Sequence, residues 1–345
     1  MRIVDPIEGD YIETKRDNLF FDVKGLFHPN DYVICFLRFF PYSKGERLKN
    51  GIFFKKVYKL NERYEILRKN YPKYIFFSEE LDLEVQGVKN EEIKNIYSPR
   101  IFFKDLLKKN EFSISESYAK SLCELFITDG NLSEKSIGIT GSIMVGLNME
   151  DSDIDLIIYG TETSINFQDT LKNIFKKSND CKKYTIDEYR THYNWRFGGS
   201  NIPFGTFLKS EERKLHQGKF KGHDFFIRYI KSPKDWKGNF YDYRYRNLGR
   251  ITLKADIIDS KDSIFSPCTY KIKSRKILKI STRQNNININ HIKEINSFRG
   301  RFCEQAKKGE KVILEGKLEK VNFKEESAYF RILLSDPTYD KMIII

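Results

Sequence analysis

The stretch GITGSIMVGLNMEDSDIDLIIYG, residues 138–160, decides the fold of this chain. A short apolar run ends in Gly141 and Ser142, and eleven residues after Ser142 the pair Asp153 and Asp155 begins a second apolar run. Side chains alternate between the two faces of a strand, so these aspartates converge on one side while Ile154 enters the packing. Two carboxylates held together repel each other unless a cation compensates them, and Mg²⁺ bound jointly with substrate phosphates is suited to this task.

Gly141 and Ser142 have the properties of a phosphate-binding turn. Glycine lets the backbone approach a ligand closely, the helix predicted to start there offers free N–H groups, and the Ser142 hydroxyl adds a donor. Together with the aspartate pair, they predict a site for a metal ion and a triphosphate.

The segments around this stretch predict a strand, helix, strand, helix unit. Residues 113–130 read as a helix that begins at a Ser113 cap and ends at Gly130. A short strand over 136–141, a second strand over 154–160 and a helix within 164–180 follow. This order is typical of an α+β or α/β core.

The same residues resemble the signature of the DNA polymerase β-like nucleotidyltransferase superfamily. That signature is a Gly-Ser pair followed by Asp-x-Asp at the start of a strand, and here it stands as Gly141-Ser142, an internal Gly146 and the SDIDL of 152–156. The resemblance covers roughly 115–160 and extends less clearly towards 260. It implies an α+β fold with a mixed sheet and flanking helices, and transfer of a nucleoside monophosphate from an NTP with Mg²⁺ or Mn²⁺.

The resemblance also implies a third carboxylate on a later strand, because two metal ions are held during the reaction. Asp256, in RITLKADIIDS, is the first choice; Asp224, in GHDFFIRYI, is the rival, and Asp259 comes third. In the implied mechanism Asp153, Asp155 and Asp256 are the catalytic metal ligands. Gly141 and Ser142 bind the nucleotide while pyrophosphate leaves.

Charge is distributed unevenly along the chain, whose net charge is +13. Residues 111–181 contain 5 Lys and Arg against 12 Asp and Glu, whereas residues 182–283 contain 24 against 10. An acidic block followed by a strongly basic one predicts a cation site beside a surface that binds a polyanion. The alternative is that the lysines only solvate an exposed face.

The motif YDYRYR, residues 241–246, predicts where a nucleic acid binds. On a strand it places Tyr241, Tyr243 and Tyr245 on one face and Asp242, Arg244 and Arg246 on the other. Tyrosines such as Tyr243 can stack on bases while Arg244 and Arg246 meet phosphates. The plainer alternative packs the tyrosines on the sheet and leaves the arginines in water.

Three domains are expected from the length of 345 residues and from the pattern of segments. Residues 1–110 read as an aromatic-rich α+β domain of unknown role, and 111–283 as the catalytic domain, with strands near 222–230, 239–249 and 249–260 extending its sheet. Residues 284–345 read as a small β module, similar to an OB-like barrel. The junction that leads into this module is expected near 281–296.

Several classes are excluded by composition. The five cysteines and five histidines form no zinc-binding or redox spacing, so the cysteines are expected to be buried thiols. No apolar run approaches the roughly 20 residues of a membrane span, which predicts a cytoplasmic protein without a membrane partner. Two alternatives to transfer onto an RNA or DNA end stay open: AMP transfer to a protein or small molecule, and binding of nucleotide or nucleic acid without catalysis.

Overall fold

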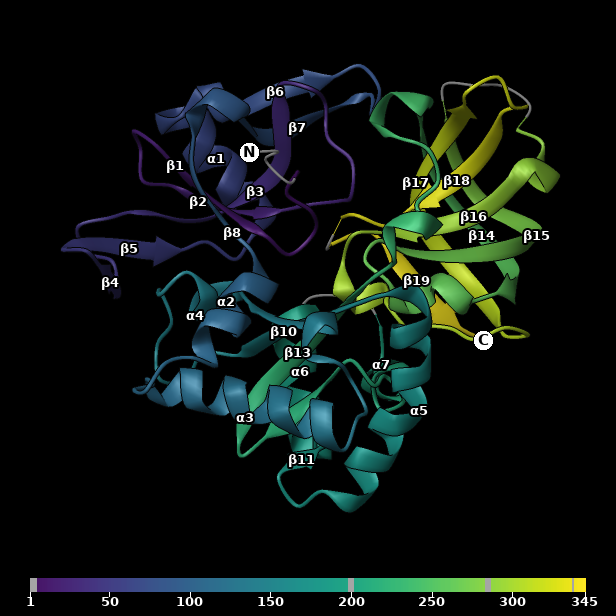
Figure 1. Cartoon of the computed structure of the whole chain (residues 1–345). Coiled ribbons are helices and arrows are strands. Elements are labelled where there is room, and N and C mark those ends of the chain that lie inside the picture. Colours follow the sequence, from purple (N-terminus) through teal and green to yellow (C-terminus); the bar gives the residue numbers. More distant parts are fainter. Residues whose placement is uncertain (1–4, 198–201, 283–286, 337) are drawn as a thin grey trace. The chain divides into compact units, whose positions relative to one another are not determined.

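The computed structural model describes residues 5–197, 202–282, 287–336 and 338–345. The chain forms two compact units (Figure 1). The first comprises Met1–Ser78, Leu83–Lys182 and Gln217–Phe240, and the second comprises Glu79–Asp82, Lys183–His216 and Tyr241–Ile345. Each unit is therefore assembled from three separate stretches of sequence.

An antiparallel eight-stranded sheet begins the first unit. Its main path runs β4–β5–β3–β2–β1–β8, while β7 pairs with β3 and with β6. The strands are β1 (Tyr11–Thr14), β2 (Phe20–Val23), β3 (Tyr32–Pro41), β4 (Arg47–Lys49), β5 (Ile52–Lys56), β6 (Ile75–Ser78), β7 (Leu83–Lys89) and β8 (Ile93–Tyr97). Helix α1 (Leu60–Asn70) contributes Leu67 to the buried core of this sheet.

A five-stranded mixed sheet forms the other layer of the first unit, in the order β11–β12–β13–β10–β9. Strand β10 runs parallel to β13 and antiparallel to β9. The strands are β9 (Ile137–Thr140), β10 (Ile154–Tyr159), β11 (Cys181–Lys182), β12 (Gln217–Phe220) and β13 (His223–Ile230). The helices are α2 (Pro99–Leu106), α3 (Ile114–Thr128), α4 (Gly141–Met144) and α5 (Thr161–Lys177). The chain is therefore mixed α and β, as expected.

Helices α3 and α5 cover one face of the mixed sheet (Figure 1). The Phe126 ring of α3 contacts Phe167 of α5 and Phe225 of β13 edge-on, at centroid distances of 5.1 and 6.1 Å. The predicted cap of α3 is also present, because Ser113 and Glu116 form a reciprocal capping box.

The N-terminal sheet contacts the mixed sheet within the first unit. Met144, Val145 and Leu147, which follow the Gly-Ser turn, share a buried core with aromatic residues of the N-terminal sheet, among them Phe54 of β5. Arg228 of β13 forms ion pairs with Glu8, which precedes β1, at 3.0 Å and with Asp22 of β2 at 3.2 Å. Residues 1–110 therefore do not form the separate domain that the sequence predicted.

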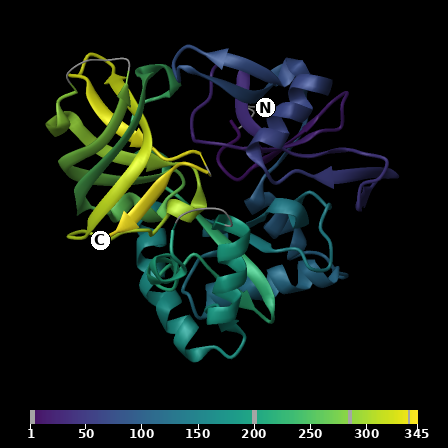
Figure 2. The same ribbon diagram turned by 180° about the vertical axis from the view of Figure 1, so that it is seen from behind.

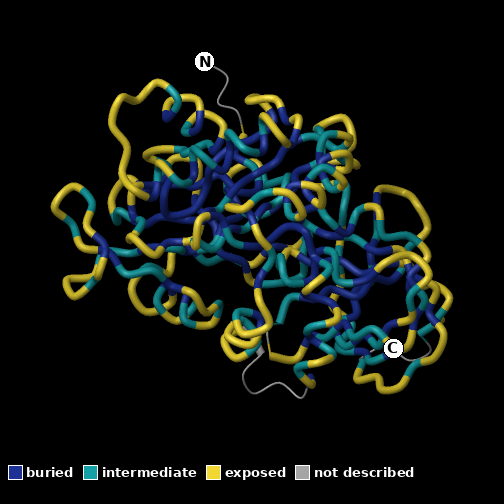
Figure 3. The backbone as a smooth tube through the Cα atoms, turned by 90° about the horizontal axis from the view of Figure 1, so that it is seen from below, coloured by how far each residue is buried: buried dark blue, intermediate teal, exposed yellow. Residues whose placement is uncertain are grey.

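The second unit is a closed ring of antiparallel strands with one parallel pair. β14 pairs with β15, β15 with β16, β16 with β18, β18 with β17 and β17 with β14, and β19 extends from β17 (Figure 2). The β16–β18 pair is parallel. The strands are β14 (Tyr243–Asp259), β15 (Cys268–Thr282), β16 (Ile292–Ser297), β17 (Lys311–Phe323), β18 (Tyr329–Leu333) and β19 (Lys341–Ile344). Buried stretches of the backbone lie in the interior and exposed stretches at the outer loops (Figure 3).

The predicted limit at 283 is therefore misplaced. The segments 239–249 and 249–260 do not extend the catalytic sheet; they join into the single 17-residue strand β14, which belongs to the ring. Gly249 lies at a register shift inside β14, so the glycine marks a bulge rather than a turn. Residues 283–286 of the predicted junction lie outside the described residues, while β15 and β16 on either side pair directly.

Helices α6 (Ile186–Phe197) and α7 (Phe204–Glu211) complete the second unit. All five cysteines are buried free thiols, as expected. Across the described ranges, no helix is both long and apolar enough to cross a membrane.

Candidate functional site

The aspartate pair stands at the start of strand β10. Asp155 belongs to the strand and Asp153 precedes it directly, while Ile154 and Leu156 are buried. Alternation along the strand directs both aspartates to the face of the mixed sheet opposite the helices. On this face Ile157 and Tyr159 also pack with Ile7 and Leu26, which flank the first two strands of the N-terminal sheet.

The Gly-Ser turn lies beside the second aspartate. Strand β9 pairs antiparallel with β10 so that Thr140 stands opposite Asp155. Gly141 follows with a φ of +73°, and a Cβ at this position would lie 2.4 Å from Oδ2 of Asp155. Both the backbone conformation and the close approach therefore require glycine here. Ser142 is buried in α4, which is a single turn, so the free N–H groups expected from a helix start belong to a very short helix.

Asp224, rather than Asp256, lies on the strand next to the aspartate pair. The parallel register of β10 and β13 sets Ile154 beside Phe225, which places Asp224 next to Asp153. Asp224 adds to the repulsion that raises the pKa of Asp153, and its carboxylate pairs with Lys219 at 3.4 Å. Asp256 instead lies in β14 of the ring, where Nε of Arg275 donates to it at 2.7 Å.

Asp256 and Asp259 therefore do not belong to the sheet that carries the aspartate pair. Asp259 also lies on β14, at its end, and accepts a hydrogen bond from the backbone N–H of Lys261 at 2.9 Å. The sequence misled because β14 reads as a strand in either sheet, and only the pairing partner decides which carboxylate joins the aspartate pair.

Two cations from the N-terminal sheet face the aspartates. Lys56 of β5 interacts electrostatically with Asp155 and Asp153, and Arg38 of β3 does the same. Arg38 donates to the backbone carbonyl of Val57 at 3.4 Å, while its buried Nε–H has no hydrogen-bond partner among the described residues. Sequence reasoning missed both cations, because about one hundred residues separate them from the aspartates and no motif links them.

The pKa values record how crowded this site is. Burial and the neighbouring Asp155 raise the pKa of Asp153, although the side chain keeps access to solvent. Burial and the charge of Arg38 lower the pKa of Lys56 to about 8. Negative and positive groups thus face each other without neutralising each other completely. A metal ion bound to a triphosphate would complement both sets.

The residues fit a divalent cation only in a limited sense. Within the part of the chain that is described, no three His, Cys, Asp or Glu side chains are arranged to hold a metal ion by themselves. Mg²⁺, however, is usually bound by one or two carboxylates together with substrate phosphates and water. Asp153 and Asp155 supply two carboxylates whose mutual repulsion a cation would relieve, so the donor set fits a cation that arrives with its nucleotide.

The predicted nucleic-acid residues lie in the second unit. Tyr243 and Tyr245 share one face of β14, with ring planes 1° apart and centroids 5.9 Å apart. Both are half-buried, and the Arg331 guanidinium lies 3.8 Å from the Tyr245 ring centroid. Arg244 and Arg246 are exposed on β14, and Arg246 donates to the carbonyl of Glu79 at 2.7 Å.

The start of the YDYRYR motif differs from the prediction. Tyr241 and Asp242 lie in a short 3₁₀ turn before β14, so the expected alternation holds only from Tyr243 onwards. Tyr241 is nevertheless exposed.

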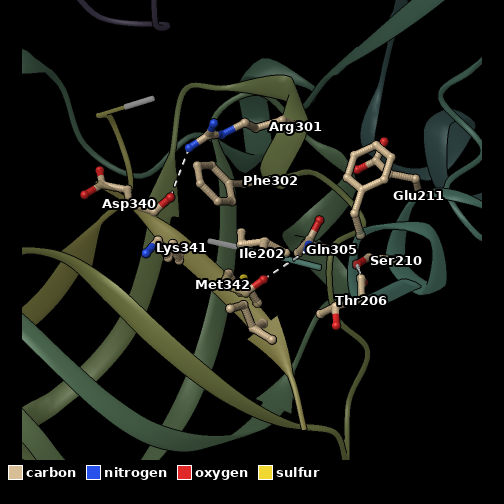
Figure 4. Close-up of a pocket in the computed structure, with 12 residues that line it drawn as sticks. Ile202, Thr206, Ser210, Glu211, Arg301, Phe302, Gln305, Asp340, Lys341 and Met342 are labelled. Carbon is tan, nitrogen blue, oxygen red and sulfur yellow. Dashed lines mark hydrogen bonds between the residues drawn. The ribbon is translucent and has the colours of Figure 1, made fainter. Parts of the chain in front are cut away.

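A cavity between α7 and the ring is too small for a substrate. It has a volume of about 20 Å³ and is closed by hydrogen bonds such as that from Gln305 to the Met342 carbonyl, 3.1 Å (Figure 4). This is room for about one water molecule. The site around Asp153 and Asp155 is therefore the better candidate for chemistry.

Comparison with known proteins adds one relative. A protein of Methanocaldococcus jannaschii, described as uncharacterized protein MJ1086, is 26% identical over 333 residues, which cover 94% of this chain and 94% of that protein. The similarity thus extends through both units. No family model matches the sequence, and no solved structure is significantly similar to it.

Proposed function

We propose that this protein is a metal-dependent nucleotidyltransferase of the polymerase β-like type. It transfers a nucleoside monophosphate from an NTP to an acceptor hydroxyl at the end of a nucleic acid. The observation that carries the proposal is the position of Asp153 and Asp155 at the start of β10, between Gly141 on one side and Asp224 on the parallel strand β13.

The strand arrangement supports the resemblance seen in the sequence. The superfamily signature implies a Gly-Ser turn, an Asp-x-Asp strand and a third carboxylate on another strand of one mixed sheet with flanking helices. Asp224 meets the last of these expectations through the pairing of β10 with β13, without any need for Asp256.

Each residue then has a defined task. Asp153 and Asp155, with Asp224 beside them, would hold Mg²⁺ or Mn²⁺ together with oxygens of the triphosphate, and the ion would neutralise phosphate charge and favour the incoming hydroxyl as a nucleophile. Gly141 lets the backbone approach the phosphates. Lys56 and Arg38 supply the positive charge that the triphosphate needs as pyrophosphate leaves. Phosphoryl transfer depends mainly on such positioning and charge neutralisation.

The second unit supports a nucleic acid as acceptor. We interpret its five-stranded ring as an OB-like barrel that begins earlier in the chain than the module expected over 284–345, and such barrels often bind single strands on the face of their second and third strands. The second strand of the ring, β15, exposes a row of basic side chains: Lys271, Lys273, Arg275, Lys276 and Lys279. Tyr243, Arg244 and Arg246 on β14 extend the surface that we assign to the nucleic acid.

Incorporation of labelled nucleotide tests this proposal. The full chain is incubated with each labelled NTP, Mg²⁺ or Mn²⁺, and single-stranded RNA or DNA. Wild-type protein should lengthen the strand, Asp153→Asn and Asp155→Asn should lose at least about 10³-fold in rate, and Asp151→Asn should keep full activity. Asp151 is a matched control, because it is an exposed carboxylate two residues before Asp153.

Three outcomes would redirect the proposal. Full activity in both asparagine variants would exclude the aspartate pair as the catalytic centre. Label on the protein itself, or on a small molecule added as acceptor, would favour AMP transfer to those classes instead. Nucleotide binding without product under any condition would favour a binding protein that does not catalyse transfer.

A further inference from the structure

A second hollow lies in the first unit, at the other end of strand β10. It has a volume of about 250 Å³ and is lined by Tyr159 and Ile230, the last residues of the parallel strands β10 and β13. Tyr159 faces the same side of the sheet as Asp155, but it lies six residues from Asp153. At about 3.3 Å per residue, roughly 20 Å separates the two places, so the hollow is distinct from the site around the aspartates.

The walls of this hollow carry positive charge. Arg100 of α2, Lys135 and Lys231 all line it, and none of its lining residues is Asp or Glu. The buried carboxylate of Asp10 interacts with both Arg100 and Tyr159, but burial raises its pKa to about 7. Asp10 therefore offsets little of the positive charge below neutral pH. The hollow favours an anion.

Tyr159 provides a hydrogen-bond donor that the protein leaves unused. Its side chain is only 5% exposed, and the Arg100 guanidinium lies 3.7 Å from its ring centroid. No hydrogen-bond partner of its hydroxyl is found in the described ranges, although the residue lines the hollow. The hydroxyl can therefore donate a hydrogen bond to a group that enters the hollow. A ligand oxygen in the hollow would satisfy it.

The backbone adds to this preference for an anion. Helix α5, 17 residues long, starts directly after Gly160, which also lines the hollow. The N-terminus of a helix carries partial positive charge and attracts phosphate groups. Ser232 lies on the same wall and accepts the N–H of Thr161 at 3.1 Å, which fixes the start of the helix.

One part of the wall is apolar and rigid. Ile7, Ile230 and Trp236 line it, and the Trp236 indole N–H donates to the Lys231 carbonyl at 3.0 Å. Phe27 packs edge-on against the Trp236 ring at 5.7 Å. An inorganic anion would leave this apolar part unused, so the ligand should carry an organic group as well.

We propose that the hollow binds a small organic phosphomonoester of mononucleotide size. Arg100, Lys135 and the Tyr159 hydroxyl take the phosphate, and Trp236 and Ile230 take the organic part. The volume lies slightly below the range usual for ligand pockets, which suits one small molecule and excludes a polynucleotide.

Calorimetric titration of the full chain with AMP and with inorganic phosphate tests this assignment. EDTA is present throughout, so that no divalent cation supports binding at the aspartates. Wild-type protein should bind AMP more tightly than phosphate. Arg100→Gln combined with Lys135→Gln should weaken AMP binding at least about tenfold, as loss of charged hydrogen bonds predicts. Tyr159→Phe, which keeps the ring beneath Arg100, should weaken it about three- to tenfold.

The control removes the same charge elsewhere. Lys104→Gln combined with Lys176→Gln changes two exposed lysines that do not line the hollow, and AMP binding should stay as in the wild type. The proposal is overturned if wild-type protein binds neither probe at millimolar concentration, if AMP and phosphate bind equally, or if the control pair weakens binding as much as the Arg100 and Lys135 pair.

Discussion

Replacement of Gly141 by alanine separates the backbone demands of the Gly-Ser turn from its role in the site. Gly141 has a φ of +73°, and its added Cβ would lie 2.4 Å from the Asp155 carboxylate. Gly51, in the turn between β4 and β5, has a φ of +76° but no atom within 4 Å of an added Cβ. The two positions thus share the backbone conformation and differ in the contact.

The left-handed conformation costs a residue with a Cβ about 1–2 kcal/mol. For a unit of this size, that cost corresponds to a fall of about 2–8 °C in the unfolding midpoint. Both Gly141→Ala and Gly51→Ala should show this fall by differential scanning calorimetry. Gly141→Ala should in addition lose about 100-fold or more in nucleotide transfer, because the Asp155 carboxylate must move by about 1 Å to clear the methyl group.

The ratio of the two transfer rates is the decisive quantity. If Gly141→Ala and Gly51→Ala transfer nucleotide at the same rate, the turn does not position Asp155 and the reasoning about the site is refuted. A larger loss of thermal stability in Gly51→Ala than in Gly141→Ala would equally contradict the packing described here.

Three further predictions concern charge. Because the pKa of Lys56 is about 8, its positive charge is lost as pH rises through 8, and the KM of the wild type for NTP should rise there. Lys56→Met should have a KM about 10–100-fold higher at pH 7 that changes little through pH 8. A parallel rise of KM in both proteins would contradict the role of Lys56. Burial raises the folded-state pKa of Asp10 to about 7, so between about pH 4 and 7 the folded state holds a proton that the unfolded state releases. The free energy of unfolding should therefore fall by about 2–4 kcal/mol as pH rises through this window. Chemical denaturation should show a flatter dependence of stability on pH for Asp10→Asn, and the same slope as in the wild type would refute this. Arg244→Gln combined with Arg246→Gln should weaken binding of single-stranded nucleic acid and reduce the slope of log K against log salt concentration by about 1.4. Tyr243→Ala should weaken binding with little change in this slope. Binding equal to the wild type in the double arginine variant would remove these residues from the interface.

The sequence predicted local structure correctly where residues that are close in the sequence are also close in space. The capping box of Ser113 and Glu116 and the alternation of Asp153 and Asp155 depend on spacings of two or three residues. Gly141 belongs to the same class, because the turn that it opens joins two strands paired with each other.

The errors of the sequence analysis arose where the structure depends on pairing between segments that are distant in the sequence. Asp224 stands beside Asp153 only because β13 aligns in parallel with β10, and the sequence of β13 does not name its partner. Gly249 reads as a turn in the sequence, yet β14 continues through it as a bulge. An added Cβ would lie 2.1 Å from the Ser281 carbonyl oxygen of the paired strand β15, so the close approach of β15 requires glycine here. Asp256 thereby follows β14 into the second unit.

The cations around the aspartates show the same limit. Lys56 and Arg38 belong to a region in which no catalytic spacing is visible, and they reach the site because Phe54 and its neighbours pack against the residues that follow Ser142. A composition-based division at residue 110 conceals such packing.

The most direct test of the metal–nucleotide site is anomalous diffraction from crystals of the full chain grown with Mn²⁺ and a non-hydrolysable NTP analogue. We expect a manganese peak coordinated by the carboxylates of Asp153 and Asp155 and by phosphate oxygens, with Asp224 beside it and no peak at Asp256. A peak at Asp256, or nucleotide bound elsewhere with no metal at the aspartate pair, would contradict the proposed active site.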